Sequence, residues 1–385
     1  MKIGLLGFTF ANANKGCEAL TYSFLYTIQR LFSDSVEVCY YSYSDDFGAV
    51  KKYFPSMTFS NYKLSRKKIL TNLKSSFDSC DLVFDISFGD GFADIYNPKG
   101  VFWNTLIKQI ANKSKAKLVL LPQTYGPFNS KLLEMQAADA IKHAELVLSR
   151  DALSSKYVNQ ISGVLPKTVT DLAFSLPYSE PQKNDDGILR VGLNVSGLLW
   201  KGGFYKENQF GLTVNYQKYI QSLIEKLLAR PDTEIHLIPH VIETIPGSND
   251  GDLFVNDLLT AKYPNLIKAP AFKDPIETKD YIAKMDIVTA ARMHATVDSF
   301  SAGVPVIPFA YSRKFEGLYG SLGYDYIVDG CRETTETAVE KTMAFIGRQE
   351  EMKARILSCK VGMDEKNRAY YHALERIMGQ IKSEA

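Results

Sequence analysis

Short apolar runs alternate with helical patterns from the first residues of this chain. The run KIGLLGF comes first, a helical pattern covers residues 18–32, and the run VEVCYYSY follows. The runs are nearly continuous in apolar residues, which is typical of strands buried on both faces of a parallel sheet. Strands that alternate with helices build such sheets, with helices on both faces. The pattern therefore predicts a doubly wound α/β fold.

The alternation continues along the chain and is interrupted once. Further strands are predicted at DLVFDISF, KLVLLPQ and ELVLSR, with helices in a basic segment and near residues 101–113 and 131–142. The segment YSEPQKNDDGILR then breaks the rhythm with Pro, Asn, Asp and Gly, which indicates a linker at residues 178–189.

After the linker the same rhythm resumes. Strands are predicted at RVGLNVSG, EIHLIPH, DIVTAA and VPVIPF, with helices near 215–229, 252–262 and 277–284 and a short helix after DIVTAA. After about residue 334 the chain is helical and charged to its end.

These patterns predict two doubly wound, Rossmann-like domains that face a cleft. The first domain covers residues 1–177 and the second covers 190–360, and a final helix at 361–385 packs back on the first domain. Open α/β sheets bind ligands at the carboxyl ends of their strands. We therefore expect the site where strands end.

Composition excludes several classes of protein. The chain has 385 residues, 45% of them hydrophobic and 23% charged, with 45 lysines and arginines against 43 acids. A balance so close to neutral argues against a nucleic-acid partner. The local run Arg66-Lys67-Lys68 indicates a solvated face, with a membrane or anion contact as the alternative.

The five scattered cysteines form no C-x-x-C pair, which predicts reduced thiols in a cytoplasmic protein. The apolar stretch at residues 3–11 and the following Ala-Asn-Ala loosely resemble a signal peptide, but KIGLLGF also fits a first strand, which we favour. No run of 18 apolar residues is present, so no membrane span is expected. We expect a cytoplasmic protein, peripheral at most to the inner face of the cell membrane.

Polar residues follow four predicted strands of the first domain. They are Asn14, Gly16 and Glu18 after the first strand, Asp90 after DLVFDISF, Gln123 and Tyr125 after KLVLLP, and Arg150 after ELVLS. A glycine and a helix start after a strand suit an anion, although a turn that caps the helix is an equal alternative. The loop lacks G-x-G-x-x-G, so it does not predict a dinucleotide site.

The second domain shows a similar arrangement. Asn194 ends one strand and His240 ends the next, where a structural histidine is an equal alternative. The pair Asp250 and Asp252 resembles the D-x-D of metal-dependent sugar transferases, but a turn in a polar loop is the favoured interpretation. The histidines lack zinc-site spacing on a helix, and we expect no metal or cofactor.

The strongest candidates are Arg292 and His294, which follow the predicted strand DIVTAA. Arg292 offers a planar fork for a carboxylate or phosphate. His294 can exchange a proton near neutral pH. A helix of small residues begins at this point, and its first amides would add to the attraction of an anion.

The stretch ARMHATVDSFSAGVPVIPFAYSRKFEGL closely resembles the signature of the polysaccharide pyruvyl transferase family. Other landmarks of the family occur in its order: Asn14-Lys15-Gly16-Cys17-Glu18, Gly89-Asp90-Gly91, Pro122-Gln123 with Gly126-Pro127, Ser149-Arg150-Asp151, Asp171-Leu172-Ala173-Phe174 and Gly192-Leu193-Asn194. The chain departs from the family at Asp90, where a third glycine is common, and at Cys17, where an acid is common. The resemblance covers about residues 1–320.

The resemblance implies a fold like that of the two-domain GT-B glycosyltransferases, with the acceptor on the first domain and the donor on the second. It also implies transfer of a carboxyethylidene group from phosphoenolpyruvate to two hydroxyls of a sugar in a cell-surface polysaccharide or its lipid-linked precursor. Arg292, Arg150 and Lys314 would bind the donor anion, and His294 would act as acid and base. Tyr125 and Trp200 could stack on a sugar ring.

Two other functions compete with this one. A nucleotide-sugar glycosyltransferase would use the same architecture, but the position of its ribose-binding glutamate after the Arg-x-His helix is unfilled, with Glu316 nearest. An inactive carbohydrate-binding partner would turn over no donor. The sequence leaves the acceptor sugar and the oligomeric state open.

Overall fold

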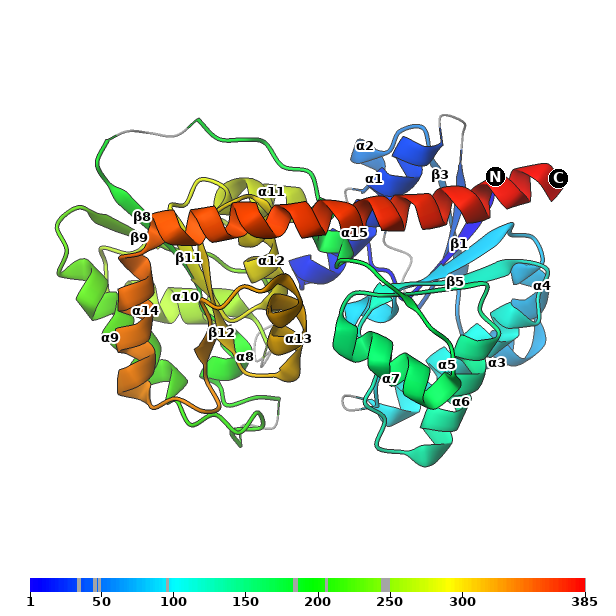
Figure 1. Cartoon of the computed structure of the whole chain (residues 1–385), viewed down its shortest axis with the longest axis horizontal. Helices are drawn as coiled ribbons and strands as arrows, with labels where there is room; N and C mark the ends of the chain where they lie inside the picture. The colour runs from blue at the N-terminus through cyan, green and yellow to red at the C-terminus, as the bar shows by residue number, and fades with distance from the viewer. Residues whose placement is uncertain are drawn as a thin grey trace. The chain divides into compact units, whose positions relative to one another are not determined.

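A computed structural model of the chain describes residues 1–32, 36–43, 47, 50–94, 97–182, 186–204, 207–243 and 250–384. The chain divides into two compact units. Unit 1 contains Met1–Ala11, Leu20–Leu172 and Met363–Ala385, and unit 2 contains Asn12–Ala19 and Ala173–Gly362. Each unit is built around one sheet (Figure 1).

The sheet of unit 1 has seven parallel strands in the order β3-β2-β1-β4-β5-β6-β7. The strands are β1 (Lys2–Leu6), β2 (Glu37–Ser42), β3 (Thr58–Lys63), β4 (Leu82–Asp85), β5 (Lys117–Gln123), β6 (Leu146–Ser149) and β7 (Lys167–Thr168). The central strands β1, β4 and β5 are buried almost throughout, which explains their continuous apolar sequences.

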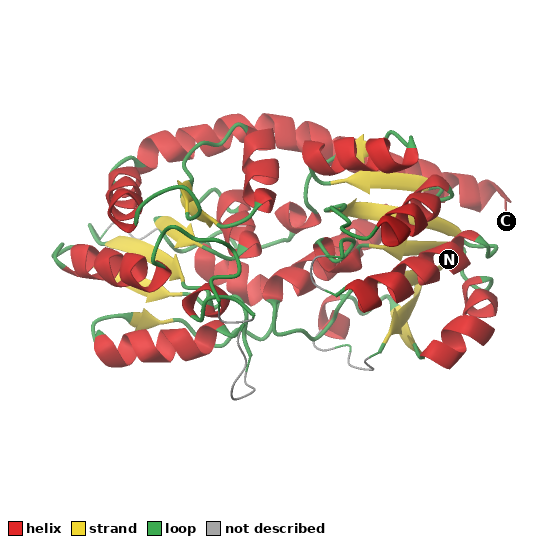
Figure 2. Ribbon diagram, turned by 90° about the horizontal axis from the view of Figure 1, so that it is seen from below, coloured by secondary structure: helices red, strands yellow, loops and turns green. Residues whose placement is uncertain are grey.

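The helices of unit 1 lie on both faces of this sheet (Figure 2). They include α2 (Val50–Tyr53), α3 (Arg66–Thr71), α4 (Leu73–Phe77), α5 (Pro98–Asn112), α6 (Lys131–Lys142) and α7 (Ala152–Ser162). Helices α3 to α7 share one hydrophobic cluster with the strands, to which they contribute Ile69, Leu73, Ile107, Leu133 and Val158. These helices therefore cover the same face of the sheet.

Side-chain caps fix where several of these helices begin. Ser65, Asn97, Ser130 and Asp151 each accept a hydrogen bond from an amide in the first turn of the helix that follows. Such caps satisfy amides that have no partner within the helix.

Unit 2 contains a six-stranded parallel sheet in the order β10-β9-β8-β11-β12-β13. Its strands are β8 (Leu189–Asn194), β9 (Thr233–Leu237), β10 (Ile267–Lys268), β11 (Ile287–Ala290), β12 (Val306–Ala310) and β13 (Val328–Asp329). Its helices are α8 (Gly197–Trp200), α9 (Tyr216–Leu228), α10 (Asp252–Lys262), α11 (Pro275–Ile282), α12 (Met293–Ser301), α13 (Arg313–Leu322) and α14 (Thr335–Ile346).

Two helices contribute residues to both units. Helix α1 (Lys15–Leu31) belongs to unit 2 as far as Ala19 and to unit 1 from Leu20. Helix α15 (Gln349–Glu384) belongs to unit 2 as far as Gly362 and to unit 1 beyond it. Within unit 1 the two helices are in contact, because the Arg30 guanidinium lies 4.9 Å from the centre of the Tyr371 ring.

The predicted fold class is confirmed, since both units are parallel α/β sheets with helices on their faces. The strand KIGLLGF is present as β1. The two-residue strands β7, β10 and β13 were not predicted because they are too short to show a pattern. In the described part of the chain, no helix has the length and apolar composition needed to cross a membrane.

Candidate functional site

Arg292 lies at the carboxyl end of β11 and is the N-cap residue of α12. Its guanidinium is buried and contacts two carboxylates. Nε and Nη2 donate to Asp252 Oδ1 at 3.1 and 2.7 Å, and Nη1 donates to Asp250 Oδ1 at 2.6 Å. Burial alone would lower the pKa of Arg292, but Asp252 and Asp250 raise it above its ordinary value. The charge of Arg292 is therefore largely compensated by its own chain.

Asp252 joins three strand ends of unit 2. Its fully buried carboxylate accepts hydrogen bonds from the amides of Gly197, His240 and Val241 at 2.9–3.0 Å as well as from Arg292. Asn194 also donates to it, at 3.3 Å, and Asn194 Oδ1 accepts the amide of Arg292 at 3.0 Å. The aspartates that resembled a D-x-D motif thus hold Arg292 and neighbouring loops.

His294 lies in the first turn of α12, against the loop that begins α1. A Cβ atom added at Gly16 would lie 2.2 Å from His294 Nδ1 and 2.5 Å from His294 Cβ. No side chain fits in that space, which explains the glycine at this position. The N-cap side chain makes no capping hydrogen bond to α12, so this helix end suits an anion.

Gly16→Ala is expected to displace His294 and to destabilise the fold by about 1–3 kcal/mol, as overpacked sites do. The clash involves the root of the imidazole and not a flexible tip, so a rotamer change alone cannot relieve it. Denaturant unfolding would measure the loss. Gly320→Ala is the matched control, because a Cβ atom there meets nothing within 4 Å. Equal stability of the two variants would contradict this account.

The segment Asn12–Ala19, which includes the first residues of α1, contacts the segment that follows β9. Asn14 forms an isolated bridge with Val241, and the Lys15 amide donates to the His240 carbonyl at 3.0 Å. Asn14 Oδ1 in turn accepts the amide of Gly16 at 3.0 Å. Asn14 and Gly16 therefore shape the loop that lies beside His294.

Glu18 forms a buried ion pair with Lys15, with Nζ and Oε2 2.8 Å apart. Glu18 Oε1 also accepts the amide of Asn12 at 2.7 Å. Burial raises the pKa of Glu18, and Lys15 opposes that shift. Glu18 was proposed as a site residue, whereas Lys15 was named only as part of a family landmark. The partners of Lys15 lie on two segments, since Nζ also donates to the Lys273 carbonyl at 3.1 Å.

His240 is fully buried and lies 3.1 Å from Asp298 through its Nε2 atom. Asp298 is one turn after His294 on α12. This helix therefore carries His294 and contacts His240 through Asp298. The buried Lys279 adds a positive charge near Asp298 and donates to the Leu176 carbonyl at 2.7 Å. Burial lowers the pKa of Lys279 to about 8. Asp298 and Lys279 were missed by the sequence analysis.

Lys314 lies in the first turn of α13, in unit 2. The structure places it on a different helix from His294. Trp200 ends the short helix α8 and is partly buried.

In unit 1, Arg150 is buried and forms an ion pair with Asp171, 2.7 Å from Nη1 to Oδ2. Burial alone would lower the pKa of Arg150, but Asp171, Asp151 and Asp90 together raise it. The Arg150 guanidinium also lies close to the Gly89 backbone, since a Cβ atom there would be 3.6 Å from Nη1. The structure therefore brings Arg150 and the Gly89-Asp90-Gly91 turn together at one edge of this sheet.

Gln123 and Tyr125 belong to the core of unit 1. Both are fully buried, and the Tyr125 hydroxyl donates to the Leu148 carbonyl at 2.9 Å. Placed in this way, the Tyr125 ring offers no face to a sugar. Gln123 Nε2 donates to Asp85, and Asp85 forms a fully buried ion pair with Lys108 at 3.0 Å. This pair was not predicted, although an aspartate inside the apolar run DLVFDISF is an unusual feature.

The turn after β4 has a strained backbone. Ser87 and Phe88 adopt φ angles of 42° and 56°, which residues other than glycine rarely adopt. Such conformations cost about 1–3 kcal/mol each and concentrate at functional sites. Phe88 is 45% exposed and lies directly before Gly89 and Asp90.

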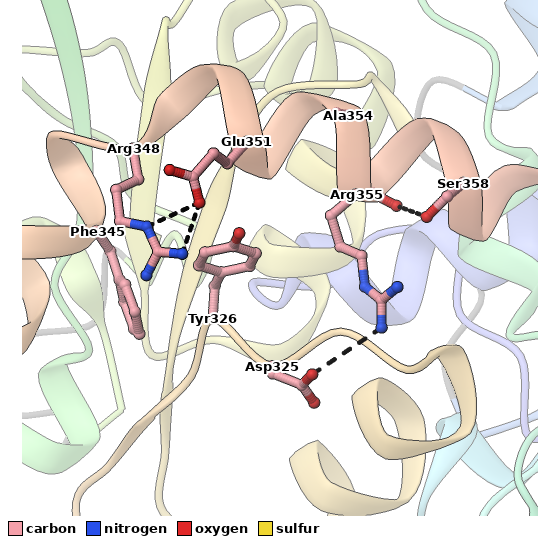
Figure 3. Close-up of a pocket in the computed structure, with 8 residues that line it drawn as sticks. All are labelled: Asp325, Tyr326, Phe345, Arg348, Glu351, Ala354, Arg355 and Ser358. Atoms are coloured by element: carbon pink, nitrogen blue, oxygen red, sulfur yellow. Dashed lines mark hydrogen bonds and ion pairs between the residues drawn. The ribbon is translucent and has the colours of Figure 1, made fainter.

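Two cavities in unit 2 have linings that do not include Arg292. A cavity of about 490 Å³ is lined by Tyr326, Arg348 and Arg355 among others (Figure 3). Arg348 pairs with Glu351 there, and Arg355 faces Asp325 at 3.9 Å. A second cavity of about 450 Å³ adjoins α13 and includes Arg313. Glu351 and Asp325 offset the charges of the two arginines in the first cavity. Its lining therefore has no excess positive charge that would attract an anion.

Among the described residues, no group of three or more His, Cys, Asp or Glu side chains could hold a metal ion. The two aspartates that suggested a metal instead bind Arg292.

Comparison with known proteins assigns the chain to a family. The model of the family described as polysaccharide pyruvyl transferase matches residues 14–313. The chain belongs to the polysaccharide pyruvyl transferase family. The match spans Asn14, Arg150, His240, Arg292 and His294, and it ends at Arg313, just before Lys314. No curated protein sequence matches the chain.

Solved structures of other transferases and epimerases share the fold of this pyruvyl transferase family member. UDP-GlcNAc 2-epimerase from Neisseria meningitidis, bound to UDP-GlcNAc, has a TM-score of 0.59 at 10% identity, with 92% of this chain and 94% of that chain covered. UGT2 of Phytolacca americana, complexed with UDP-2-fluoro-glucose and pterostilbene, has a TM-score of 0.56 at 10% identity, with 98% and 99% covered. These likenesses confirm the predicted GT-B-like fold class.

Proposed function

We propose that this chain transfers a carboxyethylidene group from phosphoenolpyruvate to two hydroxyls of one sugar, forming a pyruvate ketal. The sugar belongs to a cell-surface polysaccharide or to its lipid-linked precursor. The observation that carries the proposal is the family match over residues 14–313, together with Arg292 and His294 at the amino end of α12.

The reaction needs one proton donor and a site for anions. A proton added to the methylene carbon of phosphoenolpyruvate leaves a cation-like carbon, which the first sugar hydroxyl attacks as it gives up its proton. The bond to phosphate then breaks, and the second hydroxyl closes the ketal. Two protons leave the sugar: one restores the acid and the other leaves with phosphate. The site must therefore move protons and bind a phosphate and a carboxylate.

Residues of unit 2 suit both tasks. His294 is assigned the proton transfer to carbon, and Arg292 and the first amides of α12 bind the donor anion. Asn194 holds the Arg292 backbone, and Asn14 with Gly16 shapes the loop against His294. His240, held by Asp298, and Glu18 are further titratable groups of this region.

Residues of unit 1, and Lys314 of unit 2, are assigned secondary tasks. Arg150 is proposed to bind an anionic group of a substrate, because Asp171 helps to keep it charged by raising its pKa and its guanidinium lies beside the Gly89 backbone. Asp90 lies on the strained turn and is proposed to contact the sugar acceptor. Lys314 would add positive charge for the donor. Gln123 and Tyr125 are assigned to the packing of unit 1, because both are fully buried.

Incubation of the purified chain with phosphoenolpyruvate and candidate glycans, lipid-linked ones included, tests the proposal. Mass spectrometry should show a product heavier by one pyruvate less one water, and phosphate should be released in equal amount. Phosphoenolpyruvate alone should raise the melting temperature, since a ligand that binds only the folded state stabilises it. Chelator treatment should leave turnover unchanged.

Stabilisation by nucleotide sugars and not by phosphoenolpyruvate would instead support a GT-B-type glycosyltransferase. Turnover of neither donor with any glycan would support an inactive carbohydrate-binding protein.

A further inference from the structure

Exposed apolar side chains gather on three helices that cover one face of the unit 1 sheet. Leu70 on α3, Phe102 on α5, and Leu132 and Met135 on α6 are 68%, 39%, 69% and 61% exposed. Large apolar side chains exposed together on neighbouring elements indicate a surface that binds something.

The three helices present these residues near the same edge of the sheet. Helices α5 and α6 follow strands β4 and β5, and Phe102, Leu132 and Met135 lie within their first five residues (Figure 1). Helix α3 is only six residues long and follows β3. It is joined to α5 because the Arg66 guanidinium lies 5.7 Å from the centre of the Trp103 ring. Helices α5 and α6 are joined by a hydrogen bond from Gln136 Nε2 to the Phe102 carbonyl, 3.4 Å long.

Basic residues surround the apolar ones. The exposed cations are Arg66, Lys67 and Lys68 on α3, Lys99 on α5 and Lys131 on α6. Glu134 on α6 pairs with Lys131 and therefore offsets one of these charges. The nearby Asp94 is buried and accepts the amides of Asn129 and Ser130, so it does not face the cations. The patch keeps an excess of positive charge.

We propose that these residues form a basic-apolar surface that binds the face of an anionic lipid membrane. The term covers Arg66, Lys67, Lys68, Leu70, Lys99, Phe102, Lys131, Leu132 and Met135. Lysines and arginines are drawn to anionic headgroups, and apolar tips between them enter the boundary between headgroups and acyl chains. Trp103, half-buried behind Phe102, suits the same boundary.

A membrane fits this surface better than the other occupants do. A second copy of the chain would bring five cations against the same five, because a two-fold interface pairs each patch with itself. A soluble polyanion would use the cations but would gain nothing from the exposed apolar side chains of Leu132 and Met135. Only a membrane surface uses the charge and the apolar side chains together.

The test uses the whole chain with two kinds of vesicle and no donor or acceptor. Vesicles of phosphatidylcholine with phosphatidylglycerol should sediment the protein, whereas vesicles of phosphatidylcholine alone should bind it far more weakly. Higher salt should weaken the binding. Lys67→Ala, Lys68→Ala and Lys99→Ala combined should reduce the affinity about a hundredfold, because each charge near an anionic membrane is worth roughly a fivefold change. Leu132→Ser with Met135→Ser should also reduce it.

Matched controls lie at the opposite ends of the same helices. Lys113, Lys115 and Lys142 are also exposed. Lys113 directly follows α5, and Lys142 is the last residue of α6. Replacing these three with alanine should leave vesicle binding unchanged, as should Leu165→Ser, although Leu165 is 83% exposed. Melting temperatures establish that each variant folds.

Three results would overturn the proposal. The first is no binding to anionic vesicles at low salt, and the second is an equal loss in the control lysine variant, which would indicate attraction by overall charge. The third is a change of oligomeric state in the Leu132 and Met135 variant without any vesicle binding, which would make the surface a self-interface. Because no donor is present, each outcome is independent of whether the chain transfers pyruvyl groups.

Discussion

Replacing His294 with alanine is expected to lower turnover by about 10²–10⁴-fold while the affinity for phosphoenolpyruvate changes little. The proton transferred to the methylene carbon has to come from a positioned acid, and removing that acid affects the transition state more than the bound substrate. Direct calorimetric titration with phosphoenolpyruvate and steady-state turnover at saturation separate the two effects.

The pH dependence gives a second measurement of the same variant. If His294 moves the proton, one limb of the pH–rate profile disappears in His294→Ala, because the titrating group is gone. His294→Gln should also be slow, since an amide can form hydrogen bonds but cannot exchange a proton near neutral pH. His143→Ala, an exposed histidine on unit 1, should behave like the unchanged protein.

The opposite result is equally informative. Normal turnover of His294→Ala at saturation, with much weaker donor binding, would make His294 an anion ligand. The acid and base role would then pass to His240 or Glu18. His240 is the better placed of the two, because Asp298 holds its Nε2 atom and fixes the ring.

The fold was largely readable from the sequence because its strands are buried on both faces. An apolar run such as KLVLLPQ at β5 is shielded from water on both faces only inside a sheet that helices cover. Strand β3 was not recognised, because as an edge strand it is only partly buried and its sequence TFSNYK mixes polar and apolar residues. Helix α10 was predicted at its observed bounds, Asp252–Lys262.

The candidate site was harder to derive, because its partners are distant in the sequence. The guanidinium of Arg292 was expected to be available to a ligand. Instead, it donates hydrogen bonds to Asp250 and Asp252, about forty residues earlier in the chain. Lys279 and Asp298 lie in helices whose composition gives no sign of a buried charge. Motif reasoning found the residues at strand ends, but the compensating charges become visible only once the chain is folded.

Arg292 is expected to bind the donor anion in both ground and transition states, so its loss should mainly raise the Michaelis constant for phosphoenolpyruvate. A bidentate contact to a charged group is worth about 1.5–3 kcal/mol, which corresponds to roughly a 10- to 150-fold increase. Lysine should be a poor substitute, since a point charge cannot form the planar fork. Arg292→Ala should also lose stability, by about 3–5 kcal/mol, because the buried carboxylate of Asp252 is left without its cation.

Because Arg292→Ala affects both the fold and the donor, a second variant has to separate the two roles. Asp252 is fully buried and bonded to three amides, so replacing it would disturb the fold. Asp250 is the better choice, since its side chain is 29% exposed and contacts Arg292 at Nη1. Asp250→Asn removes a negative charge that would compete with a donor anion for the same guanidinium, and it keeps the size of the side chain.

Asp250→Asn is therefore expected to lower the Michaelis constant for phosphoenolpyruvate by roughly two- to fivefold, since a partly exposed ion pair is worth about 1 kcal/mol or less. Turnover and melting temperature should change little. The matched control is Asp325→Asn, which removes a carboxylate beside Arg355 at the cavity of Figure 3 and should leave all three quantities unchanged. If Asp250→Asn leaves the Michaelis constant where it was while Arg292→Ala unfolds readily, Arg292 serves to hold the strand ends together. The donor anion would then have to be bound by the first amides of α12 and by another cation.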